Sequence, residues 1–125
     1  GKPRSQRIEN RLGGADANPY LALAATLGAG FLGIKEKIKP TGPVNGTAYS
    51  VKTEKRHTVP SSLLEAAKIF KESKAARAMW GDKFVEHYAS TRIWEYEKYI
   101  KERPVFETKP EKISDWELKR YFEII

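Results

Sequence analysis

The stretch RIENRLGGADANPY, residues 7–20, carries a charged side chain at every second position and then passes through a glycine pair to a proline. Because side chains alternate along a β-strand, a strand at residues 6–12 would present Arg7, Glu9 and Arg11 on one face. The alternation is typical of an edge strand whose charges discourage aggregation. It also fits the polar wall of a binding site, and the alternation alone does not decide between the two.

The residues after the glycine pair predict a helix from Pro19 to Ile38. Asn18 suits the N-cap position, and Pro19 suits the first helical position, where no amide hydrogen is needed. Apolar residues then recur at helical spacing, namely Tyr20, Ala24, Leu27, Phe31, Ile34 and Ile38. Three glycines within the helix each weaken it by about 1 kcal/mol relative to alanine, which favours close approach of another backbone. We therefore expect this helix to be the most buried element, with its apolar face turned inward.

The rest of the sequence predicts further helices. The expected segments are a loop at 39–60 with a short extended piece at 49–51, and helices at 63–73, 74–80, 83–103 and 115–125. Ser62 and Ser114 each begin a capping-box pattern. Gly81 stops the 74–80 helix, and Asp82 suits the N-cap of the next one. The chain is therefore expected to hold one strand followed by four or five helices.

The composition indicates one soluble domain. The chain has 125 residues, 40% of them hydrophobic, which suffices for a single core. It has no cysteine, which excludes disulfides, thiolate metal sites and a cysteine nucleophile. Its longest apolar run, residues 20–34, is too short to span a membrane. The net charge of +7 is compatible with an anionic partner such as nucleic acid, a phosphate ligand or an acidic protein.

A lone strand cannot satisfy its own backbone hydrogen-bonding groups. The predicted strand at residues 6–12 therefore needs partner strands that this sequence hardly supplies. The loop at 39–60 is also unusually long for a compact domain, which suggests that other parts of a larger protein hold it. Since the first residue is glycine and not methionine, we expect a polypeptide that is trimmed, carries residues left from an expression tag, or is a piece of something longer.

Several segments together resemble the glutamine synthetase family. RIENRLGGADANPYLALAATLGAG is similar to the last active-site strand and following helix of that family, and ISDWELKRYFEII resembles the C-terminal helix of its bacterial members. PSSLLEAAKIFKES and WGDKFVEHYASTRIWEYEKY fit the same spacing. The resemblance implies that residues 1–125 are the C-terminal portion of an α+β catalytic domain, itself mostly helical.

The resemblance also implies an activity. Members of the family join the γ-carboxylate of glutamate to ammonia or an amine, using ATP to form a γ-glutamyl phosphate, and they need Mg²⁺ or Mn²⁺. By position, Glu9 would bind the metal, Arg7 a nucleotide phosphate, and Arg11 the glutamate or its phosphorylated γ-carboxyl group as a catalytic residue. Arg4 falls where the family often has a further basic nucleotide contact. On this interpretation the alternating charges are a phosphoryl-transfer wall.

The family resemblance extends to assembly and location. It implies a cytoplasmic homo-oligomer of stacked rings, with no membrane association and no role in nucleic acid binding. The remaining metal carboxylates and most glutamate contacts would precede this segment, so the chain alone is expected to be inactive. Ammonia and small amines both fit as the acceptor.

The rival interpretation is a non-catalytic basic helical domain that binds nucleic acid or protein. It is weakened because the lysines near residues 68–74 stand beside Glu65 and Glu72, which leaves no basic stripe. His57 and His87 lack metal-ligand spacing. Three tryptophans, at positions 80, 94 and 116, have helical spacing typical of core residues rather than of base-stacking platforms, and Ser61, Ser62 and Ser114 suit helix caps rather than nucleophiles.

Overall fold

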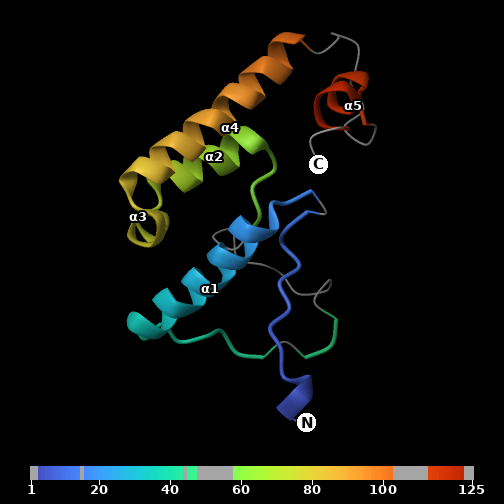
Figure 1. Ribbon diagram of the computed structural model, residues 1–125. Coiled ribbons are helices and arrows are strands. Elements are labelled where there is room, and N and C mark those ends of the chain that lie inside the picture. The colour runs from blue at the N-terminus through green and yellow to red at the C-terminus, as the bar shows by residue number, and fades with distance from the viewer. Residues whose placement is uncertain (1–2, 15, 44, 48–57, 103–112, 123–125) are drawn as a thin grey trace. The chain divides into compact units, whose positions relative to one another are not determined.

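The computed structural model describes residues 3–14, 16–43, 45–47, 58–102 and 113–122 and separates the chain into two compact units, Gly1–Lys39 and Pro40–Ile125. The described residues are mostly helical (Figure 1). A short 3₁₀-helix at Pro3–Ser5 (η1) is followed by α1 (Pro19–Lys35), α2 (Leu63–Glu72), α3 (Lys74–Trp80), α4 (Asp82–Glu102) and α5 (Asp115–Tyr121). The helices predicted from capping residues and periodicity are confirmed. The predicted extended piece at 49–51 and His57 lie outside the described residues.

The predicted strand at residues 6–12 does not form. These residues belong to no helix or strand, and no β-strand occurs anywhere in the described ranges. A strand forms only where a second strand accepts and donates its backbone hydrogen bonds. The described residues contain no second strand, so the segment has the charge alternation of a strand but not its pairing.

The N-terminal unit is built on α1, whose first turn is capped as predicted. The Asn18 side-chain oxygen accepts hydrogen bonds from the backbone N–H groups of Tyr20 at 3.0 Å and Leu21 at 3.1 Å, and Pro19 occupies the first helical position. The helix ends at Lys35, three residues before the predicted end at Ile38. Lys37 adopts a left-handed conformation with φ of 54°, and the Ile38 amide bonds back to the Gly33 carbonyl, a geometry that stops a helix.

The expectation that α1 is the most buried element is wrong for this chain. None of its residues is buried, and the face expected inside is largely exposed, with Tyr20 at 82%, Leu27 at 69% and Phe31 at 71% exposure. Apolar residues also occupy the other sides of the helix, so a single inward stripe is the wrong description. Gly30 and Gly33 have open space where a Cβ would be. A helix that is apolar all round is normally buried by neighbours on several sides, and the described residues do not provide them.

The C-terminal unit has its core between α2 and α4, which lie side by side as an antiparallel pair (Figure 1). The buried apolar side chains in the described residues are Ala67, Ala76, Val85 and Ala89. Trp80, Phe84 and Tyr88 follow at four-residue intervals, with successive ring centroids 4.9 and 5.6 Å apart. Phe70 of α2 meets Tyr88 edge to face at 5.6 Å, so aromatic contacts extend the small core along the helix pair.

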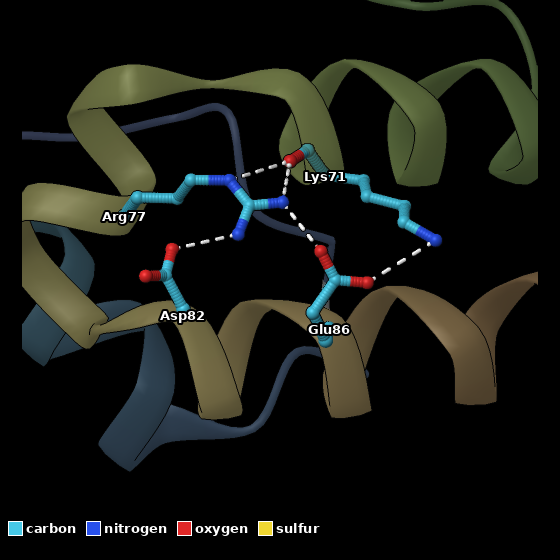
Figure 2. Close-up of polar contacts among 4 residues, drawn as sticks. All are labelled: Lys71, Arg77, Asp82 and Glu86. Carbon is cyan, nitrogen blue, oxygen red and sulfur yellow. Dashed lines mark hydrogen bonds and ion pairs between the residues drawn. The ribbon is translucent and has the colours of Figure 1, made fainter.

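A polar cluster joins the ends of three helices in this unit (Figure 2). The Arg77 guanidinium donates to the Lys71 backbone carbonyl at the end of α2, to Asp82 at 2.7 Å and to Glu86 at 2.5 Å. Lys71 Nζ also reaches Glu86 at 3.2 Å, and hydrogen bonds from Arg77 and Lys71 lower the pKa of the Glu86 carboxyl. Asp82 is thus the first residue of α4 rather than its predicted N-cap, because its carboxylate faces Arg77.

The last helix is held against α4 by a buried carboxylate. Glu95, only 4% exposed, accepts from Arg120 Nε at 2.8 Å, from an Arg120 terminal nitrogen at 3.0 Å and from the Tyr121 hydroxyl at 2.8 Å. Trp116 Nε1 donates to Glu102 at 2.9 Å. The predicted capping box of α5 is present, with Ser114 and Glu117 bonded to each other's backbone amides. These contacts make α5 part of the C-terminal unit.

Candidate active site

The residues assigned to chemistry lie on the segment that precedes α1. Arg4 is in the η1 turn, which the Gln6 amide closes by donating to the Pro3 carbonyl at 3.3 Å. Arg7, Glu9 and Arg11 follow in the irregular stretch, and all four side chains are exposed. The predicted residues are therefore presented to solvent from one short segment rather than enclosed in a pocket of the described chain.

Glu9 and Arg11 are brought together. Arg11 Nε donates to Glu9 Oε1 in an ion pair whose side chains are 83% and 56% exposed respectively. Side chains two residues apart lie on the same side of the backbone only where the backbone is extended. The Glu9–Arg11 pair therefore agrees with the prediction that these alternating charges share one face. An exposed pair of this kind contributes about 0–1 kcal/mol to stability, so it orients the two groups more than it stabilises the fold.

The chemistry available here is that of one carboxylate among cationic groups. Carboxylate oxygen is a ligand that hard divalent cations prefer, so Glu9 fits a share in a Mg²⁺ or Mn²⁺ site. Among the residues that the structure describes, no three His, Cys, Asp or Glu side chains gather closely enough to hold a metal. Guanidinium groups beside Glu9 suit planar contacts to phosphate or carboxylate.

The charged segment contacts α1 through Asn10, a residue to which the sequence patterns assigned no role. Asn10 Nδ2 donates to Thr26 Oγ1 on α1 at 3.0 Å, and Asn10 Oδ1 accepts from the Leu12 amide at 3.0 Å. Two signals for this contact were available. Asn10 falls between Glu9 and Arg11, so in an extended segment its side chain is expected on the opposite side, and Thr26 is the one residue with a hydrogen-bonding side chain between Leu21 and Ile34.

The other candidates identified in the sequence take structural positions. Ser62 and Ser114 are N-caps as predicted, and the Ser61 amide and hydroxyl both donate to Glu65. His87 is exposed on α4. Trp80 and Trp116 are half-buried in aromatic clusters, whereas Trp94 is 53% exposed, with Lys98 Nζ 5.1 Å from its ring centroid. None of the described helices is long and apolar enough to cross a lipid bilayer.

The comparison with protein families gives this geometry its context. Residues 1–121 match the model of the glutamine synthetase catalytic domain, a range that includes the N-terminal unit with the whole charged segment and all but the last four residues of the C-terminal unit. The chain belongs to the glutamine synthetase family. No solved structure matches it.

The relatives are ligases of glutamate. The chain is 46% identical over 119 residues to a glutamate–isopropylamine ligase from Pseudomonas sp, covering 95% of this chain and 24% of that protein. It is 38% identical to the gamma-glutamylethanolamide synthetase GlnA4 of Streptomyces coelicolor, covering 98% and 24%. It is 36% identical to the glutamine synthetase of Pyrococcus furiosus, covering 95% and 28%. The chain thus spans about a quarter of the length of these relatives.

Proposed function

We propose that this chain is the C-terminal portion of the catalytic domain of a longer enzyme that joins the γ-carboxylate of glutamate to ammonia or a small amine. ATP phosphorylates the carboxylate, and the amine then displaces phosphate from the γ-glutamyl phosphate. The observation that carries the proposal is the family match along residues 1–121, which includes the whole R-x-E-x-R segment. The coverage of about a quarter of each relative supports the view that other parts complete the enzyme.

Each charged residue of the segment has a role in this proposal. Glu9 would help to hold Mg²⁺ or Mn²⁺, which would neutralise negative charge on the ATP phosphates. Arg7 and Arg4 would contact a nucleotide phosphate. Arg11 binds glutamate and stabilises the charge that develops on its γ-phosphoryl group. The exposure of all four side chains supports the proposal, since exposed groups are accessible to a substrate.

The same proposal accounts for the missing strand. Residues 6–12 join a sheet supplied by the preceding part of the protein, which gives the complete catalytic domain its α+β character. Pairing there keeps Arg7, Glu9 and Arg11 on one face. By analogy with the family, the complete enzyme is a cytoplasmic homo-oligomer of stacked rings, and this chain alone is inactive because one carboxylate cannot build the cation sites.

A small primary amine is the acceptor to test first. The relative that is 46% identical carries isopropylamine in its name, and the one that is 38% identical carries ethanolamide. The glutamine synthetase of Pyrococcus furiosus is less similar, at 36%. Because the relative named for isopropylamine is more similar than this glutamine synthetase, isopropylamine is tested before ammonia.

The proposal is tested with the complete protein that contains this chain. Formation of γ-glutamyl hydroxamate from glutamate, hydroxylamine and ATP is measured with Mg²⁺ and with Mn²⁺, and phosphate release is then followed with ammonia, isopropylamine and ethanolamine. Activity that requires ATP, metal and glutamate is expected. Absence of ligation with every acceptor, together with salt-dependent binding of nucleic acid, would instead establish the basic interaction domain.

A further inference from the structure

A short series of hydrogen bonds ties the charged segment to α1. Leu12 N–H donates to Asn10 Oδ1 at 3.0 Å, Asn10 Nδ2 donates to Thr26 Oγ1 at 3.0 Å, and Thr26 Oγ1 donates to the Ala22 carbonyl at 2.8 Å. All the participants belong to the N-terminal unit. The series begins within the stretch that holds Glu9 and Arg11 and ends on the helix backbone.

The direction of each bond follows from the groups involved. A backbone N–H is only a donor, so the atom of Asn10 that faces Leu12 has to be the amide oxygen. The amide nitrogen then faces Thr26 and donates to it. The Thr26 hydroxyl has one hydrogen, which goes to the Ala22 carbonyl, and its lone pairs accept from Asn10. If the Asn10 amide were flipped, its NH₂ group would face the Leu12 N–H, and two donors cannot hydrogen-bond to each other. The side-chain amide therefore has one consistent orientation.

The helix side of the contact offers little choice of partner. Between Leu21 and Ile34 every residue other than Thr26 is Leu, Ala, Gly, Phe or Ile. Apolar contacts alone are non-directional, so such a surface would let a neighbouring segment slide along it. Thr26 is the one side chain on this stretch of α1 that accepts a hydrogen bond from Asn10, so the pair favours a single alignment of the segment on the helix.

Register at this point decides where the charged side chains go. Shifting a drawn-out segment by one residue turns every side chain to the opposite side. Asn10 lies directly between Glu9 and Arg11, so holding its side chain on Thr26 turns both charged neighbours away from α1. We infer that Asn10 and Thr26 are positioning residues that set the register of the Arg7–Arg11 segment on α1 and thereby aim Glu9 and Arg11 for catalysis. This inference rests on the proposed function.

The experiment uses the complete protein with variants that remove the bond from either side. Thr26→Val keeps the shape of the side chain and removes the hydroxyl, Asn10→Leu removes the amide, and the double variant removes both. Thr26→Ser restores the hydroxyl and serves as the rescue. For each protein we would measure kcat, the KM for ATP, the Mg²⁺ concentration that gives half-maximal rate, and the thermal unfolding midpoint.

Each single variant is expected to lower kcat about tenfold and to raise the Mg²⁺ requirement by a similar factor, as for residues that orient metal ligands. The double variant should lose no more than the larger single loss, because both changes break the same bond. Thr26→Ser should keep most of the rate. A merely structural role would lower the unfolding midpoint without moving the Mg²⁺ requirement.

Beyond that outcome, three further results would overturn the inference. These are full activity in Thr26→Val, losses that multiply in the double variant, and a Thr26→Ser protein as impaired as Thr26→Val, which would assign the effect to the methyl group. Glu9→Gln, measured in parallel, distinguishes a failure of the positioning role from a failure of the proposed function. If Glu9→Gln raises the Mg²⁺ requirement while the Thr26 variants do not, only the positioning role falls. If the unsubstituted protein ligates no amine to glutamate, the proposed function and the positioning role fall together.

Discussion

At the scale of single residues, a substitution of Arg11 distinguishes a catalytic role from a role in which only its positive charge matters. Lysine keeps the positive charge of arginine but lacks its rigid planar fork. If Arg11 stabilises the γ-phosphoryl group in the transition state, Arg11→Lys in the complete enzyme should lower kcat by roughly a hundredfold, about 3 kcal/mol, and weaken ATP binding far less. Hydroxamate formation at saturating ATP measures this. Equal rates for the two proteins would exclude a catalytic Arg11.

Glu9 gives a prediction with a different readout. Glu9→Gln preserves the volume of the side chain and removes its charge, so it should raise the metal concentration needed for half-maximal rate by about tenfold while leaving the fold intact. The measurement is the rate of the complete enzyme against Mg²⁺ concentration. Glu36→Gln, an exposed change at the far end of α1, is the matched control. An unchanged metal requirement would remove Glu9 from the metal site.

At the scale of elements, Glu95 determines whether α5 stays on α4. Its buried carboxylate accepts three hydrogen bonds from Arg120 and Tyr121. Glu95→Gln in the present chain removes the charge that Arg120 requires, and hydrogen bonds to charged groups contribute about 1.5–3 kcal/mol each. Amide hydrogen exchange within residues 115–121 should therefore accelerate about tenfold or more. Glu97→Gln, exposed on the same helix, should leave it unchanged, and equal exchange in both variants would contradict the assignment.

The same contact predicts how α5 responds to pH. Hydrogen bonding from Arg120 lowers the pKa of Glu95 below its ordinary value of 4.5, so the stabilisation is complete above pH 4.5 and is lost as the pH falls through the lower, folded value. Burial raises the pKa of Tyr121 from 10.0 to about 12, so its contribution is complete below pH 10 and is lost as the pH rises towards 12. Near-ultraviolet circular dichroism of the Tyr99–Trp116–Tyr121 cluster should be constant between these limits. A transition near neutral pH would be inconsistent with this pairing.

Helix ends could be predicted from sequence because their determinants are local. Asn18 bonds to amides two and three residues ahead, and the Ser114–Glu117 capping box closes within one turn. Glu95 and Arg120 are 25 residues apart and Asn10 and Thr26 are 16 apart, and neither spacing follows from a local pattern. The predictions of a strand at 6–12 and of an inward face on α1 failed for a further reason. Each required a partner surface, and the described residues supply none.

The candidate site was predictable only in part, for the same physical reason. The shared side of Glu9 and Arg11 follows from a period of two, and the two side chains do meet. Their proposed roles came from the resemblance of R-x-E-x-R followed by A-N-P-Y-L to a known family. Under the proposed function, the further metal ligands around Glu9 would come from elsewhere in the complete protein. No pattern within this segment encodes them.

At the scale of the whole molecule, the decisive feature is the apolar surface of α1. Its exposed apolar side chains include Tyr20, Leu23, Leu27, Phe31 and Ile34, each at least 64% exposed. A continuous apolar surface of this kind on a soluble protein marks a contact with another chain or another part of the same protein. We expect the isolated chain to self-associate through α1, whereas in the complete enzyme the preceding part of the catalytic domain covers this helix.

A single substitution tests both expectations, self-association through α1 in the isolated chain and covering of α1 in the complete enzyme. Phe31→Glu places a charge in the middle of the exposed face, so in the isolated chain it should shift the sedimentation profile towards monomer and leave the helicity of the C-terminal unit unchanged. In the complete enzyme the same change would bury that charge against apolar neighbours, which costs several kcal/mol, so it should yield insoluble or inactive protein. Lys35→Glu, at the exposed end of α1, is the control for charge alone and should do neither. A complete enzyme that tolerates Phe31→Glu would show that α1 remains exposed there, and the proposed covering of α1 by the preceding part of the domain would be wrong.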